Sequence, residues 1–511
     1  MKITIILIAL LFFLPVSTVA AEIFPRGKCG RYEIKNACQL AEIQAQATLF
    51  DETGGMRGSL DFLSGDYVLA ADIDLPISWT PIGDSDTNAR FAFCGTFDGA
   101  GFVIRGLNIS DSSARSVTRG LFGKVEGAEI RNVVLENPVL HAYGDYGSKE
   151  FSTGLLAGEI IGGKIENIRI VGGEIIVTAP EAGNGAVGGL VGKASDTQFE
   201  NITITDTHVG DVNGTVLMLR EPRRDMRNIP LISSALRAVG GVAGYLENCT
   251  AKNILFLNGK IDANAISSGG IAGQIRGGEF FSCGANFVTV DGTEYVGGFV
   301  GLVQENARFE NCHATARVLG NGTIGGFAGR VNGAEAGAAR IGAEFIRCRA
   351  FGSAGDSGDR GAVLLSPLAG GFVGRLAGRS RVTSSNAYVY VISCNSGGFV
   401  GEITNASRIE FSAAHGAVFG SEAAGGFAAI ISSTGAPNTI TSSLALGRIV
   451  AGSENTTFRF AAIPEHDGIN GCYSFLGMAV IANGVLSHVI PNPYGKDGGD
   501  ISIKSLRGMI F

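Results

Sequence analysis

The side chains that could carry hydrolytic chemistry are spread widely along this chain. Its six histidines stand at positions 141, 208, 313, 415, 466 and 488, and none of them falls in a His-Glu-x-x-His sequence. The spacing that places two zinc ligands on one helix face is therefore missing. Cys312 and His313 are adjacent, but neighbours on a strand point to opposite faces, so we do not expect a nucleophile–base dyad there. The sequence predicts no peptidase site of either kind.

Asp72 and Asp74 are a carboxylate pair with a spacing that suits glycoside hydrolysis. On a strand they would share one face about 7 Å apart, within the range of an inverting pair. An exposed Asp-x-Asp is more often only solvated, however, and no set of Asp, His or Arg recurs on one face of neighbouring repeats. We therefore expect a protein that is not an enzyme, and keep a polysaccharide lyase or glycoside hydrolase as the alternative.

Composition argues against nucleotides and nucleic acids as ligands. The net charge of −7 provides no positive field that would attract a nucleic acid. Residues 183–188 match G-x-G-x-x-G, but a chain with 77 glycines is expected to match by chance. No helix pattern follows whose N-terminus would bind phosphate. No cofactor and no metal site are predicted.

Glycine supplies the main pattern of the sequence, a Gly-Gly-Φ-Φ-Gly element in which Φ is apolar. Its ten copies place the glycine before the first apolar residue at 120, 154, 189, 241, 270, 298, 326, 371, 398 and 426. The unit is 27–29 residues, with insertions in some copies. Each unit is expected to form a strand–turn–strand coil that buries its apolar face only by stacking on its neighbours, so the array is expected to be a solenoid. The paired glycines are expected either to supply positive φ at a corner or to let adjacent coils approach without a Cβ clash.

A second, four-residue element follows each glycine element, as in Ile165-Glu166-Asn167-Ile168. Its last position forms a column that is predicted to point into a narrowing core: Val133, Ile168, Ile202, Ile254, Cys283, Cys312, Cys348, Ser385, Ser412 and Ser443. Free Cys acts in such a column as a small hydrophobe. A stacked disulfide such as Cys283–Cys312 stays open as an alternative, because rungs about 4.8 Å apart would allow the bond.

The two ends differ from the repeats. Residues 22–64 are expected to cap the solenoid with a short helix, because Asn36 and Gln39 have the spacing of a capping box. Residues 65–454 hold the solenoid repeats, and residues 455–511 are expected to close the other end. Whether Cys29 and Cys38 form a disulfide that staples the N-terminus stays open.

Residues 1–21 have the pattern of a secretory signal peptide, with Lys2, an apolar run that Pro15 interrupts, and small residues before the cleavage point. The apolar run is shorter than a transmembrane helix needs. The chain is therefore expected to be secreted or at the cell surface, with the periplasm as a further option. No transmembrane segment is expected after signal cleavage.

The glycine element resembles the core of the GLUG-motif repeat proteins. The residues ahead of it are similar as well, in Ala71-Asp72-Ile73-Asp74-Leu75, Trp79-Thr80-Pro81-Ile82-Gly83 and Gly95-Thr96-Phe97-Asp98-Gly99. The resemblance covers about residues 65–445. It implies an all-β, right-handed parallel β-helix (β-solenoid) at the surface of, or secreted from, mostly bacterial cells. GLUG repeats accompany adhesins and also immunoglobulin-cleaving metallopeptidases, so the resemblance does not decide the activity.

The largest insertion lies in the 52-residue step from Gly189 to Gly241. Loops that leave one face of a solenoid often carry its binding function. This loop holds the densest basic cluster of an acidic chain: Met218, Leu219, Arg220, Arg223, Arg224, Met226 and Arg227. It is a candidate partner-binding loop for host or cell-surface glycans or proteins that join acidic to apolar groups. The alternative is a solvated loop whose arginines pair with nearby acids or face water.

The function expected from these features is an adhesin-like, non-enzymatic surface protein that presents a rigid binding surface. An inert structural scaffold is a further alternative, because a solenoid of this kind can serve as a stalk without any ligand.

Overall fold

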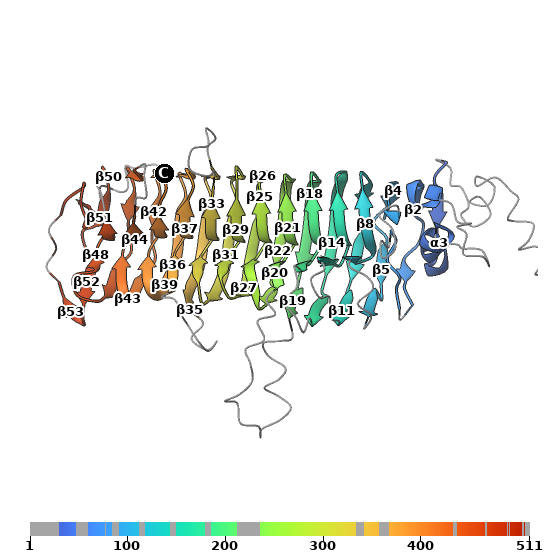
Figure 1. Cartoon of the computed structure of the whole chain (residues 1–511), viewed down its shortest axis with the longest axis horizontal. Helices are drawn as coiled ribbons and strands as arrows, with labels where there is room; N and C mark the ends of the chain where they lie inside the picture. Colours follow the sequence, from blue (N-terminus) through green and yellow to red (C-terminus); the bar gives the residue numbers. More distant parts are fainter. Residues whose placement is uncertain are drawn as a thin grey trace, which may run out of the picture.

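The computed structural model describes residues 30–505, apart from 48–59, 77, 84–90, 112–117, 144–149, 179–184, 212–235, 334–341, 357–366, 433–436, 465–467, 488, 490 and 503–504. The described chain winds into a parallel β-solenoid of about 11 turns, which confirms the all-β solenoid predicted from the repeats (Figure 1). Successive coils follow the sequence along the long axis, so each coil pairs with the coils before and after it.

The two apolar residues of the glycine element lead into an 11-stranded sheet, here called the motif sheet. Its strands, one for each coil, are β8 (Phe122–Glu126), β13 (Ala157–Ile161), β17 (Val191–Ser195), β21 (Ala243–Glu247), β25 (Ala272–Arg276), β29 (Val300–Gln304), β33 (Ala328–Asn332), β37 (Val373–Ala377), β40 (Val400–Ile403), β44 (Ala428–Ile431) and β49 (Ala461–Pro464).

The other strands belong to one sheet that wraps around the remaining sides of the coil. The second element opens the strands β4 (Thr96–Asp98), β9 (Glu129–Arg131), β14 (Lys164–Val171), β18 (Gln198–Thr205), β22 (Thr250–Leu257), β26 (Glu279–Phe281), β30 (Arg308–Glu310), β34 (Glu344–Ile346), β38 (Arg381–Thr383), β41 (Arg408–Glu410), β45 (Thr439–Thr441) and β50 (Ile469–Asn470).

After the next corner comes the side that we call the long face. Its strands are β5 (Val103–Arg105), β6 (Asn108–Asp111), β10 (Val134–Glu136), β11 (Val139–Tyr143), β15 (Glu174–Thr178), β19 (His208–Asp211), β23 (Lys260–Asp262), β27 (Gly284–Asp291), β31 (His313–Gly320), β35 (Arg349–Asp356), β39 (Asn386–Gly397), β42 (Ala413–Ala414), β43 (Val418–Gly425), β46 (Leu444–Ala445), β47 (Ile449–Gly452), β51 (Tyr473–Phe475) and β52 (Ala479–Ala482).

Short strands then lead back to the glycine element of the next motif-sheet strand. They are β7 (Thr118–Arg119), β12 (Phe151–Gly154), β16 (Gly185–Gly188), β20 (Leu236–Gly240), β24 (Ala265–Gly269), β28 (Tyr295–Gly297), β32 (Thr323–Gly325), β36 (Leu368–Gly370) and β48 (Thr457–Phe458).

The column at the end of the second element points into the core, as predicted. Its members are between 0 and 2% exposed, and parallel pairing keeps them in line, for example Ile168 beside Ile202. Cys283, Cys312 and Cys348 are free thiols, so the packing ladder is observed and a disulfide between stacked cysteines is not. Each sulfur lies against the backbone carbonyl two residues before it.

Where this column becomes small, another column of the core becomes large. From Phe299 onward the first apolar residue of the glycine element is Phe in place of Leu, Val or Ile, and these rings stack coil on coil 4.6–5.0 Å apart at Phe299, Phe327, Phe372, Phe399, Phe427 and Phe460. From Cys312 onward the small Cys and Ser side chains and the large Phe rings occur in the same coils. Volume is therefore redistributed within the core and not lost from it.

Close approach explains the glycine pairs. A Cβ added to Gly298 would lie under 3.0 Å from the carbonyl oxygen of Gly326 in the next coil, and the corresponding glycines from Gly189 to Gly426 meet the same obstacle. None of them has a positive φ. The left-handed corners fall instead on the third residue of the second element, at Asn132, Asn167 and Asn201, with φ of 54–56°. Asparagine tolerates this conformation better than most residues.

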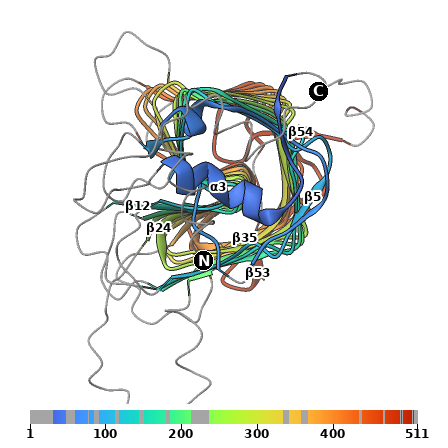
Figure 2. The same ribbon diagram turned by 90° about the vertical axis from the view of Figure 1, so that its right-hand side faces the viewer.

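The N-terminal end of the solenoid is covered by α3 (Ala37–Ala47), which lies across the coil in the end-on view (Figure 2). The N-cap half of the predicted capping box is present: Asn36 accepts the N–H of Gln39 at 3.0 Å, and the Gln39 side chain accepts the N–H of Lys35, one residue before the N-cap, at 2.7 Å. The face of α3 that includes Leu40 is buried. Around it lie β1 (Tyr32–Ile34), the 3₁₀ turn η1 (Leu60–Ser64), β2 (Asp66–Leu69) and β3 (Ile73–Asp74).

At the other end, pairing continues beyond residue 454, where the glycine motif has ended. β49 pairs with β44 and β52 with β47, and β53 (Val485–Leu486) and β54 (Gly499–Ile501) follow. Arg459 is only 3% exposed and donates to Asp500 at 2.7 Å. This ion pair ties the last segment to the last coil.

Candidate functional surface

The carboxylate pair predicted as an alternative catalytic site is a structural contact. Asp72 accepts the N–H of Val103 at 3.0 Å and pairs with Arg105 at 3.1 Å. The hydrogen bond from Val103, followed by that from Arg105, lowers the pKa of Asp72. Asp74 is exposed beside Arg105 in the register. A carboxyl group held in its ionised form is a poor proton donor, so Asp72 does not suit the role of general acid in glycoside hydrolysis.

The described histidines do not assemble into a metal or nucleophile site. Cys312 is buried while the neighbouring His313 is half-buried on the outer side, which agrees with the predicted opposite orientation. Burial, together with the charge of Arg349, lowers the pKa of His313. His141 and His208 lie on either side of Glu174, each with a ring nitrogen 3.5 Å from a carboxylate oxygen. Within the described ranges no group of three His, Cys, Asp or Glu side chains could hold a metal ion.

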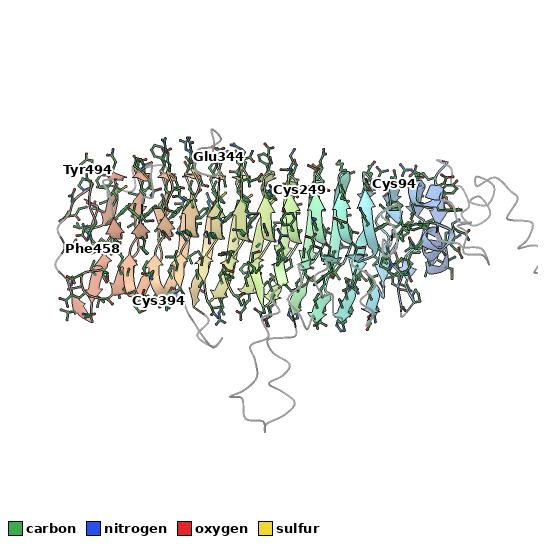
Figure 3. All side chains as sticks on the ribbon, in the orientation of Figure 1. Cys94, Cys249, Glu344, Cys394, Phe458 and Tyr494 are labelled. Atoms are coloured by element: carbon green, nitrogen blue, oxygen red, sulfur yellow. The ribbon has the colours of Figure 1, made fainter. Side chains whose placement is uncertain are left out.

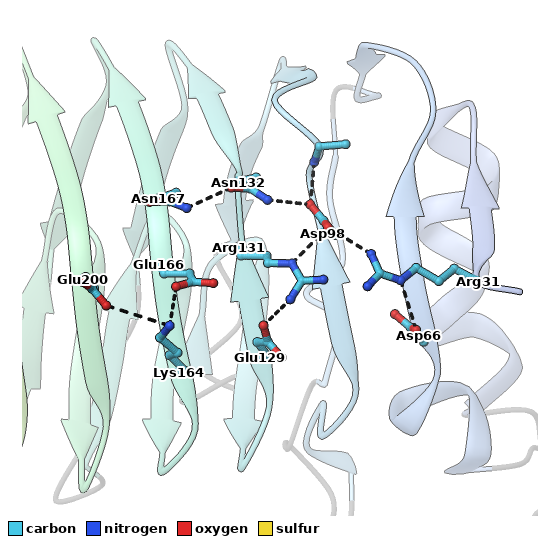
Figure 4. A network of polar contacts seen from close by, with 11 residues as sticks. Arg31, Asp66, Asp98, Glu129, Arg131, Asn132, Lys164, Glu166, Asn167 and Glu200 are labelled. Atoms are coloured by element: carbon cyan, nitrogen blue, oxygen red, sulfur yellow. Dashed lines mark hydrogen bonds and ion pairs between the residues drawn. The ribbon is translucent and has the colours of Figure 1, made fainter. Parts of the chain in front are cut away.

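The outer corner within the second element carries a continuous polar network (Figure 4). Asn132 donates to Asp98 at 2.9 Å, and the side-chain amide of Asn167 donates to Asn132 at 3.1 Å. The ladder continues through Asn201 and Asn253, with spacings of 3.1 and 3.0 Å. Coils about 4.8 Å apart place equivalent amides within hydrogen-bonding distance, so each asparagine stiffens the junction to the next coil.

Charged side chains form a second row beside these amides. The Asp98 carboxylate accepts hydrogen bonds from Arg131 at 3.0 Å and from Arg31 at 3.1 Å. Arg131 also forms an ion pair with Glu129. Although burial by itself raises the pKa of Asp98, hydrogen bonds from Asn132, the backbone and Arg131 lower it overall. The next coils repeat the arrangement, with Lys164 between Glu166 and Glu200. These carboxylates are thus engaged in links between coils.

An open groove of about 500 Å³ lies farther along the same side, and Glu344 at its rim is labelled in Figure 3. Its lining consists of Gly278, Glu279, Asn306, Ala307, Arg308, Gly342 and Glu344. Arg308 pairs with Glu310 and with Glu344, both at 2.9 Å. The hydrogen bond from Arg308 is the main reason that the pKa of Glu310 is lowered. The groove offers polar contacts to a ligand, but the guanidinium group of Arg308 already forms ion pairs with two glutamates.

The long face carries a feature that the sequence analysis missed. On β39, Tyr388, Tyr390 and Ile392 point outward and are 43–45% exposed. The ring of Tyr388 stacks on Phe351 at 5.0 Å and on His415 at 4.0 Å. The sequence did contain a signal for this face. Tyr and Val alternate from residue 388 to residue 391, and successive strand residues face opposite sides of a sheet. The partners in neighbouring coils could be recognised only once the coils were aligned.

The candidate partner-binding loop, Met218 to Arg227, lies outside the described residues, so it stays a prediction. The first part of the G-x-G-x-x-G match also lies outside them. Its remaining residues form β16, which leads into the next strand, β17, and not into a helix. Gly188 is packed against the backbone of the next coil. This segment is a part of the solenoid wall, and it has no helix N-terminus for a phosphate.

Comparison with known proteins agrees with the repeat pattern. Residues 292–319 match the family described as the GLUG motif. A stretch of 172 residues, 32% of this chain, is 33% identical to Halomucin of Haloquadratum walsbyi, and it spans only 2% of the length of that relative. The crystal structure of "a putative immunoglobulin A1 protease" from Bacteroides ovatus covers 95% of this chain and 88% of its own, at 13% identity and a TM-score of 0.28, which is too low to support an inference.

No helix in the described part of the chain is long and apolar enough to cross a bilayer. The ten glycine elements occupy equivalent places in successive coils, and a family match falls on one of them. The chain is a repeat protein built on the GLUG motif.

Proposed function

We propose that this chain is an exported surface protein that presents a rigid binding face and has no hydrolytic activity of its own. The GLUG match and the similarity to Halomucin support a location outside the cell. The pattern of residues 1–21 supports export by a signal peptide. Fractionation of the native host tests this location: recovery in the cytoplasm, with residues 1–21 still attached, would contradict it.

The observation that carries the absence of catalysis is the engagement of the outer carboxylates. Asp72, Asp98 and Glu310 each accept hydrogen bonds that lower their pKa. A glycosidase needs one carboxyl group whose pKa is raised so that it can protonate the leaving group. The ion pairs that join neighbouring coils serve rigidity, because each one restrains the rotation and separation of adjacent turns.

Incubation of the purified mature protein with pectins, glycosaminoglycans and immunoglobulins tests this part of the proposal. We expect no cleavage products. Cleavage that disappears in the double variant Asp72→Ala, Asp74→Ala would overturn the proposal and assign an enzyme. Cleavage that survives in this variant would also overturn it, and would place the catalytic residues elsewhere.

We propose that the candidate partner-binding loop, Met218 to Arg227, contacts acidic partners. Deletion of residues 214–232 is expected to leave the melting temperature nearly unchanged, because closing a shorter loop changes the free energy of folding little. Binding to cells or to acidic glycans is expected to weaken. Deletion of residues 334–341, another insertion with a single arginine, is the matched control. Equal binding by the two deletion variants would remove the basic loop from consideration.

A further inference from the structure

Two arginines on the outer side of the long face differ from most other cations of the solenoid wall. Arg317 on β31 and Arg349 on β35 are both exposed. Neither guanidinium group forms a hydrogen bond or an ion pair with a residue that the structure describes. In the second element, by contrast, Arg308 and Arg381 each pair with a glutamate. Two guanidinium groups of the long face are therefore available to an anionic ligand.

These two arginines lie on neighbouring coils, whose strands β31 and β35 are labelled in Figure 1. Arg349 is aligned with His313 of β31, four residues before Arg317. The two arginine Cα atoms are thus at most about 14 Å apart, one coil across and four residues along. The charge of Arg349 adds to burial in lowering the pKa of His313. Asp291, the nearest described acid to Arg317 in the register, forms no ion pair with it. The potential at this place is therefore positive, although the chain has a net charge of −7.

An aromatic stack lies beside Arg349. Phe351 is the next outward residue of β35, and it is aligned with Tyr388 of β39. Tyr388 is 43% exposed and stacks between Phe351 at 5.0 Å and His415 at 4.0 Å. Since both faces of the Tyr388 ring are covered, the ring edge and the hydroxyl group remain for a ligand. Asn386, two residues before Tyr388, adds a side-chain amide that is aligned with Arg349.

At the next outward position of β35 a small residue takes the place of a ring. Ser353 lies in the register between Arg317 on one side and Tyr390 on the other. Tyr390 is 43% exposed, and Phe419 of the following coil lies against it at 5.2 Å. No described ring stacks on the other face of Tyr390, which is directed toward Ser353. A flat group of a ligand can therefore lie over Ser353, between the phenol ring and the guanidinium group of Arg317.

We propose that these residues bind a carboxylated polysaccharide, such as a polymer of uronic acids. The proposal rests on the proposed function, a binding face of an exported protein, and assigns to it a site and a class of ligand. A guanidinium group donates two parallel hydrogen bonds to a carboxylate. The apolar C–H side of a sugar ring packs on the free face of Tyr390, and its hydroxyl groups bind Tyr388 and Asn386. We call this site the arginine–tyrosine face, which consists of Arg317, Arg349, Phe351, Asn386, Tyr388 and Tyr390.

The arginine–tyrosine face offers less to an acidic peptide. An extended peptide adds to a free edge of a sheet, where its backbone supplies the affinity. β35 has no free edge at this place, because β31 pairs with it on one side and β39 on the other. A polysaccharide needs no such edge, since its hydroxyl and carboxylate groups bind side chains. Its carboxylates repeat along one chain, so a chain that reaches both arginines gains from the link between the two contacts.

Calorimetric titration of the purified mature protein with oligogalacturonates of increasing length tests the proposal. We expect binding that strengthens until the oligomer reaches both arginines, and no binding of dextran, a neutral polysaccharide. Arg317→Gln and Arg349→Gln should each weaken binding about tenfold, because each removes a charged hydrogen-bond donor. The matched control is Arg408→Gln, which should bind like the wild type. Arg408 is exposed on β41 of the second element and forms no ion pair with a described residue, so its replacement removes the same charge elsewhere.

Tyr390→Ala tests the sugar contact. It should weaken oligogalacturonate binding about fivefold with an unchanged circular dichroism spectrum. Three results would overturn the proposal: no binding of oligogalacturonate, an equal loss in Arg408→Gln, or equal affinity for poly-glutamate, which carries carboxylates without sugar rings. The last result would assign the face to polyanions in general.

The deletion of residues 214–232 separates this site from the candidate partner-binding loop. If the deletion abolishes oligogalacturonate binding while Arg317→Gln and Arg349→Gln keep it, the ligand binds the loop. The arginine–tyrosine face is then not the site, and the proposed function stands. Loss in the two arginine variants with retention in the deletion variant supports the site on the long face.

Discussion

The two halves of the solenoid solve the same packing problem with different side chains. In the N-terminal coils the second element ends in Ile168, Ile202 and Ile254, and the glycine element begins with Leu or Val. In the C-terminal coils the same positions hold Cys or Ser and Phe, and the rings stack 4.6–5.0 Å apart. Small residues in one column are thus matched by large residues in the other, and the core stays filled.

At the junction between the halves the two core columns do not change in the same coil, and a small cavity is left between them. A cavity of about 10 Å³ is lined by Val191, Phe199, Val242, Ala243, Leu246, Ala251, Ile254, Ile271 and Phe280. Both columns contribute to this lining, through Val242 and Ile271 on one side and Ile254 on the other. At this coil the aliphatic wall has not yet been replaced by Phe, and Ala251 interrupts the neighbouring row of large residues. The two columns therefore border the same space.

Substitution of the glycine ladder is expected to have the largest effect, and to be equal in both halves. Gly298→Val and Gly189→Val each place a Cβ against the carbonyl oxygen of the next coil. We expect each to cost about 3 kcal/mol or more of unfolding free energy, because backbone must move. Chemical unfolding measures this cost. Gly471→Asn, at φ 60° in open space, is the control that should stay near the wild type. A neutral Gly298→Val would mean that the coils separate without cost.

The exchange of volume between the two columns can be tested by a double-mutant cycle. Cys312→Ile alone overfills the core, and Phe299→Leu alone leaves it underfilled, each at a cost of about 1–3 kcal/mol. The double variant should recover at least half of the summed loss, since the two columns border the same space. Additive losses in thermal or chemical unfolding would show that the columns are filled independently.

Acid is expected to loosen the C-terminal half first. Burial lowers the pKa of His415 to about 4, whereas an unfolded histidine titrates near pH 6.5. The unfolded chain therefore binds the proton more readily, and stability present above about pH 6.5 is lost as the pH falls toward about 4. Asp98 has a lowered pKa, so its contribution is present above about pH 4 and is lost only below that.

Hydrogen exchange measured at pH 7 and pH 5 separates these two regions. Amides around His415 should lose protection at pH 5, while those around Asp98 should keep it. His415→Gln should flatten the dependence of the melting temperature on pH, leaving only the part that His313 contributes. An unchanged slope in this variant would assign the acid sensitivity to other groups.

The smallest expected effect is a gain at the junction. Val242→Ile adds one methylene group beside the cavity of about 10 Å³. We expect stabilisation of about 0.5–1 kcal/mol if the group fits, because the lining gains contacts without losing any. Val239→Ile, at a fully buried position of β20 that is absent from the cavity lining, is the matched control and should be destabilising. Destabilisation by Val242→Ile would show that the cavity cannot accept the added group.

The sequence by itself determined the repeat unit, the inward column and the N-cap of α3. These features depend on neighbours within about 30 residues and on a strict period, and a parallel solenoid carries any such period into spatial alignment. For the same reason the opposite orientations of Cys312 and His313 were predictable from strand geometry alone.

Only the tertiary structure decided how the glycines act and which outward residues meet. Gly298 could equally have served a corner, and its role depends on the distance to the next coil. Asp72 was open to solvent or chemistry until the chain brought Arg105 and the N–H of Val103 against it. Tyr388 stacks on Phe351 because the insertion that separates their repeats in sequence does not separate them in space. Contacts between coils depend on which residues of neighbouring coils are aligned. Insertions of different length change the spacing of these residues in the sequence, so the alignment cannot be read from spacing alone.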